Sequence, residues 1–73
     1  KKQRLRLWQF MLPEKADYAE DFDVEKLAKY ELTGGQINLI IKNTAYKVAV
    51  REESIFTQQD FLEEIEKEMG SSF

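Results

Sequence analysis

The segment from residue 33 to about residue 51 constrains the fold most strongly, because its apolar residues recur at the spacing of one helix face. These residues are three or four positions apart: Ile37, Ile40, Ile41, Thr44, Ala45 and Val48. A strand would alternate apolar and polar residues, and this alternation fails where positions 39 to 41 are all apolar. The pattern therefore predicts a core-facing helix about 27 Å long.

The start of this helix carries a capping box and two glycines. Thr33 has the side chain of an N-cap residue, and Gln36 follows three positions later. Gly34 and Gly35 come directly after the cap, although glycine costs about 1 kcal/mol relative to alanine inside a helix. One interpretation is that the bare amides at this positive helix end admit a ligand. The other is that the glycines only let the preceding helix pack closely.

Two shorter helices are predicted before this segment. Residues 4–12 place apolar side chains on one stripe until Pro13 ends the pattern. A polar loop anchored by Tyr18 is expected next. Asp23 then has the side chain of an N-cap, which predicts a short helix that reaches about Tyr30.

A fourth helix is predicted near the end of the chain. An extended link over residues 54–56 leads to Thr57, which forms an acidic variant of the capping box with Asp60. The helix is expected to end at Gly70. Since no strand pair or glycine-rich hairpin is predicted, the fold class is all-α, a small four-helix bundle formed as a single domain over residues 1–73.

The aromatic and apolar side chains on these stripes are expected to be structural. They form the predicted core: Trp8, Phe22, Phe56, Phe61 and Ile65. The adjacent carboxylates Glu63 and Glu64 diverge by about 100° on a helix, so they do not converge on a substrate as an acid and a base would. We assign them, like Glu52 and Glu53, to solvent.

Composition excludes several kinds of site. The 73 residues include no cysteine and no histidine, so disulfides, thiolate nucleophiles and the commonest zinc sites are absent. No phosphate loop of the form GxxxxGK[ST] is present. A net charge of −3 argues against nucleic-acid binding, and no apolar run approaches the roughly 18 residues of a membrane span. We expect a soluble, cytoplasmic domain with no catalytic residues and no metal site.

In their order and spacing, the motifs resemble the C-terminal helical lid of AAA+ ATPases. That family typically reads Asp-Leu-Glu-x-Leu-Ala, then Ser/Thr-Gly-Ala-Asp-Leu, then Asn-Glu-Ala-Ala. The matching stretches here are Asp23–Ala28, Thr33–Ile37 and Asn43–Ala45. Arg4 and Leu7, followed by Leu12 and Pro13, are similar to the opening lid helix, so the resemblance covers nearly the whole chain.

The resemblance implies a lid that sits on an upstream α/β nucleotide-binding domain and helps to enclose the adenine of ATP. The residues it places at the adenine are Leu7, Met11, Gly34 and Gly35. ATP or ADP with Mg²⁺ would be bound by the longer protein and not by this segment alone. The implied partners are the upstream domain and neighbouring subunits of a homo-oligomeric ring, a hexamer, that remodels proteins. No nucleic-acid or membrane partner is implied.

The sequence also departs from the family pattern. Gly35 stands where alanine is usual, Gln36 stands where an acidic residue is usual, and Thr44 replaces another acidic residue. Related branches place an arginine near this turn to sense the γ-phosphate; none occurs here, so we do not expect direct phosphate sensing. Because the chain begins at Lys1 without methionine, we expect a fragment of a longer protein or a processed chain. The resemblance implies that the longer protein is an ATPase.

The alternative from another class is a free-standing acidic helical interaction module. Its acidic last helix and its exposed aromatic residues would bind a partner protein without any nucleotide. The aromatic candidates are Tyr18, Tyr30, Tyr46 and Phe73. The two hypotheses differ in what they require upstream, since only the lid needs a phosphate-binding domain in the same protein.

Overall fold

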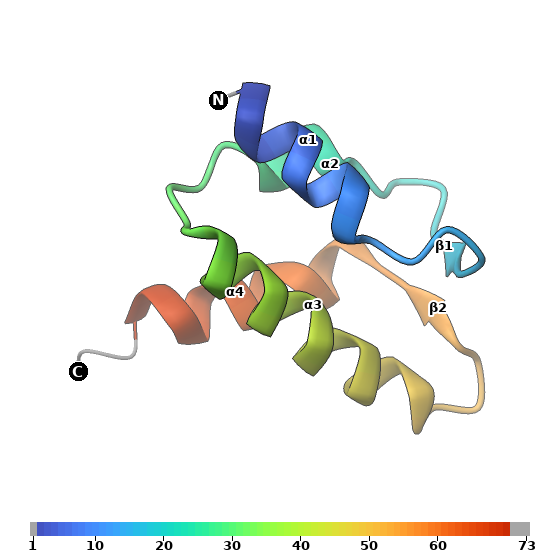
Figure 1. The fold of residues 1–73 in the computed structure, drawn as a ribbon. Helices are drawn as coiled ribbons and strands as arrows, with labels where there is room; N and C mark the ends of the chain where they lie inside the picture. Colours follow the sequence, from blue (N-terminus) through green and yellow to red (C-terminus); the bar gives the residue numbers. More distant parts are fainter. Residues whose placement is uncertain (1, 71–73) are drawn as a thin grey trace.

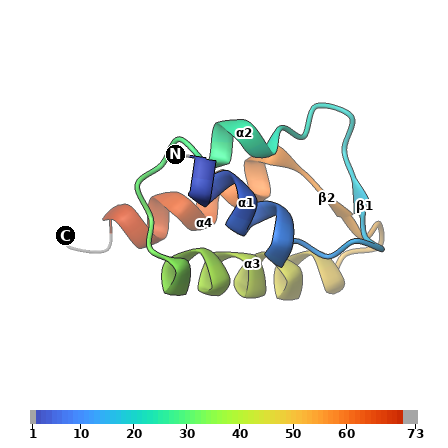
Figure 2. The ribbon, with the colours of Figure 1, turned by 45° about the horizontal axis from the view of Figure 1, so that its top comes forward.

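The structure, a computed structural model, describes residues 2–70. Over these residues the chain is mostly helical, and its elements follow one another as α1 (Lys2–Met11), β1 (Asp17–Tyr18), α2 (Val24–Leu27), α3 (Gly34–Ala49), β2 (Ile55–Phe56) and α4 (Gln58–Gly70). α3 and α4 lie against each other, and α1 and α2 lie together over them (Figure 1, Figure 2). The prediction of a small helical bundle is therefore confirmed.

The capping box at the start of α3 is present as predicted. The Thr33 hydroxyl accepts a hydrogen bond from the Gln36 amide (3.2 Å), and the Gln36 side chain accepts one from the Thr33 amide (2.9 Å). At α4 the same exchange joins Thr57 and Asp60, at 3.2 and 3.0 Å. Both helix starts thus satisfy amides that have no partner inside the helix.

The second helix is shorter than predicted. Asp23 does cap it, because its carboxylate accepts a hydrogen bond from the Glu25 amide (3.0 Å). However, α2 ends at Leu27 with Ala28 as its C-cap and does not reach Tyr30. Leu27 and Ala28 are both buried, so this single turn is held by packing more than by its length.

The strand pair is the main difference from the predicted all-α fold. β1 and β2 form a parallel pair in which Asp17 lies opposite Ile55 and Tyr18 lies opposite Phe56. The Ala19 amide extends the ladder by donating to the Phe56 carbonyl (2.8 Å). The Tyr18 and Phe56 rings stack with centroids 5.3 Å apart, and this contact holds the two extended segments together. Two-residue strands are too short to show alternation in the sequence.

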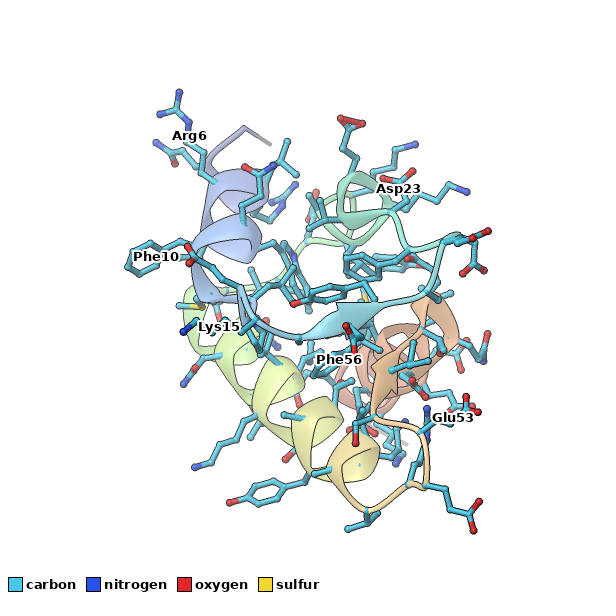
Figure 3. The ribbon with its side chains drawn as sticks, turned by 90° about the vertical axis from the view of Figure 1, so that its right-hand side faces the viewer. Arg6, Phe10, Lys15, Asp23, Glu53 and Phe56 are labelled. Carbon is cyan, nitrogen blue, oxygen red and sulfur yellow. The ribbon has the colours of Figure 1, made fainter. Side chains whose placement is uncertain are left out.

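The core lies between α3, α4 and the two shorter helices. Its buried apolar side chains are Trp8, Leu27, Ala28, Leu32, Ile37, Ile40, Ile41, Val48, Phe56, Phe61 and Ile65. Trp8 is fully buried and meets the Phe61 ring edge to face, with centroids 6.0 Å apart. Phe22, which we predicted as core, is only half-buried but contacts the same cluster. In contrast, Arg6 and Phe10 project from α1 away from the core (Figure 3).

Lys47 forms ion pairs that join α3 to α4. The Lys47 ammonium lies 2.9 Å from Glu63 and 3.3 Å from Glu64, and Lys67 also contacts Glu64 at 3.2 Å. Glu64 is only 8% exposed. Our assignment of this carboxylate to solvent is therefore wrong, because adjacent carboxylates on a helix face different ways and one of them turns toward α3.

Candidate functional site

Leu7 and Gly34, two of the four residues implied at the adenine, lie next to each other. α1 passes the N-terminus of α3 so closely that a Cβ added to Gly34 would lie 3.3 Å from Cδ2 of Leu7. Such a contact is tighter than most that a real Cβ makes. The absence of a side chain at position 34 is therefore what allows Leu7 to lie at the start of α3.

Gly35 has different surroundings. A Cβ added there would meet only the Thr33 hydroxyl at 3.9 Å, and the residue is exposed. The first hydrogen bond of α3 runs from the Ile37 amide to the Thr33 carbonyl (3.0 Å), so the Gly34 and Gly35 amides precede the intrahelical bonds. Position 35 thus offers unobstructed backbone at the positive end of a 16-residue helix.

Met11 lies one turn after Leu7 on the same side of α1. Both side chains are half-buried and pack against the core. The structure thus places two flexible apolar side chains on one helix and two glycines on the other, with Leu7 and Gly34 in direct proximity. This edge, formed by Leu7, Met11, Gly34 and Gly35, is called the α1–α3 edge below.

Each of the two interpretations of the glycines fits one of the two positions. Close helix packing accounts for Gly34, although the partner is α1 and not the preceding α2 that we expected. No packing contact requires glycine at position 35, where the added Cβ would lie in ordinary contact with Thr33 only. Gly35 is therefore the position at which access by another molecule is open.

The α1–α3 edge has binding groups and no reactive ones. It combines apolar side chains, which can pack on the face of an aromatic ring, with backbone amides, which can donate hydrogen bonds to acceptors at the edge of such a ring. Within residues 2–70 no group of three or more Asp and Glu side chains is arranged to hold a metal ion. The arrangement can position a ligand, but it offers no nucleophile, acid or base to act on one.

A second cluster of charged groups lies between α3 and α4. The Arg51 guanidinium contacts both carboxylate oxygens of Asp60, and the Nη1–Oδ2 distance is 2.9 Å. This hydrogen bonding lowers the pKa of the Asp60 carboxyl to about 2, against the opposing effect of burial. The sequence identified Asp60 as part of a cap, but nothing in it indicated the pairing with Arg51.

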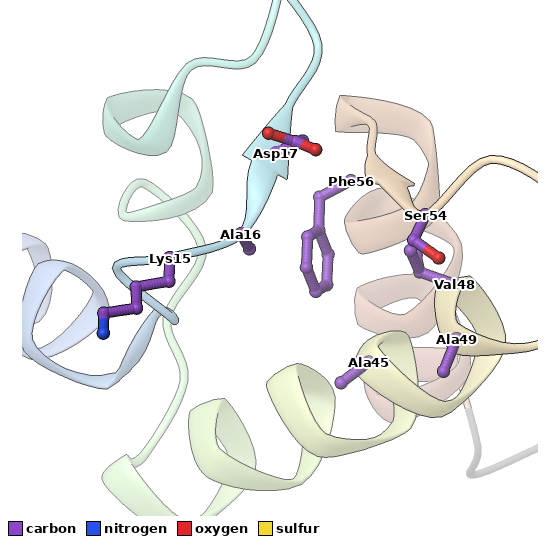
Figure 4. Close-up of a pocket in the computed structure, with 8 residues that line it drawn as sticks. All are labelled: Lys15, Ala16, Asp17, Ala45, Val48, Ala49, Ser54 and Phe56. Atoms are coloured by element: carbon purple, nitrogen blue, oxygen red, sulfur yellow. The ribbon is translucent and has the colours of Figure 1, made fainter.

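A surface hollow of about 320 Å³ lies at the other end of α3 (Figure 4). It is lined by Lys15, Ala16, Asp17, Ala45, Val48, Ala49, Ser54 and Phe56. The sequence could not identify this hollow, because its walls meet only where β1 pairs with β2. One cation, one carboxylate and one hydroxyl on an otherwise apolar lining do not form a catalytic arrangement.

The aromatic candidates of the alternative hypothesis differ in accessibility. Tyr46 is 67% exposed and Tyr30 is 36% exposed. Tyr18 is half-buried, and its hydroxyl donates to the Pro13 carbonyl (2.6 Å), so it serves the fold. Phe73 lies outside the described residues. The largest exposure belongs instead to Phe10 at 87% and Val50 at 86%, which we did not predict.

Comparison of the chain with protein-family models, with curated proteins and with solved structures yields no match. Among the described residues, no helix is both long and apolar enough to cross a membrane.

Proposed function

We propose that this chain is the C-terminal lid of an AAA+ ATPase, in which the α1–α3 edge helps to enclose the adenine of ATP. The observation that carries the proposal is the proximity of Leu7 and Gly34, with Gly35 open beside them. Leu7 and Gly34, which are far apart in the sequence and are both singled out by the resemblance, lie next to each other. Their chemistry, apolar side chains beside bare amides, fits an adenine ring.

In this proposal the domain binds and orients, while the chemistry takes place elsewhere. ATP and Mg²⁺ would supply the phosphoryl-transfer chemistry in an upstream domain of the full-length protein. Leu7 and Met11 would cover one side of the adenine and exclude water, and the backbone of Gly35 would approach its edge. In this role the domain would contribute contacts to the nucleotide and no catalytic residue.

The proposed consequence of nucleotide binding is movement of the domain as a unit. The angle between the lid and the upstream domain would depend on the bound nucleotide, and neighbouring subunits of a hexameric, cytoplasmic ring would move with it. The packing between the helices supports rigid movement, since Trp8 on α1 and Phe61 on α4 meet in a fully buried contact and α3 contacts both α1 and α4.

The test is steady-state ATP turnover by the full-length protein with Gly35→Leu. The Cβ of a leucine at this position would make only an ordinary contact with the Thr33 hydroxyl, and the rest of its side chain would obstruct an approaching adenine. We expect the KM for ATP to rise about tenfold or more. Asn43→Leu, which places the same leucine side chain at an exposed position further along α3, is the control. An unchanged KM in Gly35→Leu would contradict the proposal.

The second candidate is a helical protein-interaction module. It is favoured by the exposed apolar side chains of Phe10 on α1 and of Tyr46 and Val50 on or directly after α3. This hypothesis requires no nucleotide. If the full-length protein, folded and supplied with Mg²⁺, neither bound nor hydrolysed ATP, the interaction module would replace the lid as the better explanation.

A further inference from the structure

The two adjacent glycines at the start of α3 differ in what a side chain would meet. At position 34 an added Cβ would approach Leu7 Cδ2 to 3.3 Å, so Leu7 would have to move by a few tenths of an ångström. At position 35 the same group would meet only the Thr33 hydroxyl at 3.9 Å, an ordinary contact. An added methyl group would therefore displace Leu7 at position 34, but it would displace nothing at position 35.

Leu7 cannot relieve such a contact by moving with its helix. The next residue, Trp8, is fully buried and meets the Phe61 ring edge to face. Arg4 holds the preceding turn of α1 to α2, because its Nε donates to the Ala28 carbonyl (3.1 Å). Because α1 is held on both sides of Leu7, we expect the displacement to occur in the Leu7 side chain itself.

We propose that Gly34 is a positioning residue that sets where the Leu7 side chain lies at the N-terminus of α3. Gly34 acts through Leu7 and does not itself need to touch a ligand. Gly35, in contrast, is the position that another molecule can approach. The effect on nucleotide binding rests on the proposed function, in which Leu7 covers the adenine. The contact between Leu7 and Gly34 does not rest on it.

The experiment is a double-mutant cycle in the full-length protein, with kcat and KM for ATP measured for Gly34→Ala, Leu7→Val and the double variant. Valine has no Cδ2, so the contact with an added methyl group disappears in the Leu7→Val background. We expect Gly34→Ala alone to raise KM about three- to tenfold with little change in kcat, because a small displacement of a positioning contact weakens binding. In the Leu7→Val background it should change KM less than about twofold.

Asn43→Ala is the control, since it changes an exposed side chain of α3 that lies outside the α1–α3 edge. It should leave KM within about twofold of the wild type. The thermal midpoint of each variant shows that the protein is folded during the measurement. A purely structural role for Gly34 would change the thermal midpoint without moving KM.

The outcomes separate this inference from the proposed function. If Gly35→Leu raises KM but Gly34→Ala does not, the proposed lid function is supported and the positioning role of Gly34 is wrong. If Gly34→Ala raises KM by the same factor with and without Leu7→Val, Gly34 acts by another route and the inference is also wrong. If neither Gly35→Leu nor Gly34→Ala changes KM, the proposed function fails and the positioning role fails with it.

Discussion

Arg51 and Asp60 form a bidentate ion pair that joins the end of α3 to the first turn of α4. Asp60 is almost fully buried, and the same carboxylate accepts the Thr57 amide at the cap of α4. One side chain therefore both caps a helix and holds two helices together. Such a charge-assisted pair is stronger than a neutral hydrogen bond.

Stability should fall as the pH is lowered below about 4. The pKa of Asp60 is about 2 in the folded protein, against 3.8 for an ordinary aspartate. The unfolded chain therefore binds the proton more readily, and the stabilisation present above pH 4 is lost as the pH falls toward 2. We expect this carboxyl to account for about 2 kcal/mol of the decrease in the free energy of unfolding between pH 7 and pH 2. Urea unfolding at the two pH values measures this decrease.

Asp60→Asn is the control for this pH dependence. The variant should be less stable at pH 7, and it should lose about 2 kcal/mol less than the wild type when the pH is lowered. Glu63 also has a lowered pKa because Lys47 donates a hydrogen bond to it, so some acid sensitivity will remain. Equal pH dependence in the two proteins would contradict the assignment to Asp60.

Thr44→Val should stabilise the protein. Thr44 is fully buried in α3, and its hydroxyl has no hydrogen-bond partner among the described residues. Valine has nearly the same shape and no polar atom to bury, so we expect a gain of about 1 kcal/mol in the free energy of unfolding. Thr57→Val, which removes a cap hydroxyl, should instead cost about 1 kcal/mol. A less stable Thr44→Val variant would reveal a partner for the hydroxyl.

Lys47→Met should destabilise the contact between α3 and α4. Lys47 donates to Glu63 and to the buried Glu64, and its removal leaves Glu64 with Lys67 alone. We expect a loss of about 1–2 kcal/mol, because a poorly compensated buried carboxylate is costly. Adding Glu64→Gln should recover part of this loss. Lys67→Met, at a largely exposed side chain, should cost no more than about 0.5 kcal/mol in the same denaturation assay.

Gly35→Ala should stabilise the protein more than Gly34→Ala does. Both replacements reduce the conformational freedom of the unfolded chain, which is worth about 0.4–1 kcal/mol where the new side chain fits. It fits at position 35, but at position 34 it displaces Leu7 and part of the gain is lost. Urea unfolding of the two variants measures the difference. Equal gains would mean that Leu7 accommodates the methyl group freely.

Local sequence was sufficient for the caps and the approximate positions of the helices, although α2 ends earlier than predicted. The Thr33–Gln36 and Thr57–Asp60 boxes depend on atoms three residues apart, so their chemistry can be recognised without the fold. The stripe on α3 was also predictable, because periodicity alone shows which side of a helix is apolar. For the candidate site, it was the resemblance to a family that singled out Leu7, Met11, Gly34 and Gly35, and it did not indicate their neighbours.

Packing determined the features that join distant segments. The β1–β2 pair, the Arg51–Asp60 contact and the burial of Glu64 depend on which faces of the elements meet. Likewise, positions 34 and 35 are both glycine, and the sequence does not distinguish them. Only the path of α1 places Leu7 against Gly34 and leaves Gly35 open. Periodicity specifies that a face is apolar, but the identity of its partner depends on the shapes and contacts of side chains across the whole core.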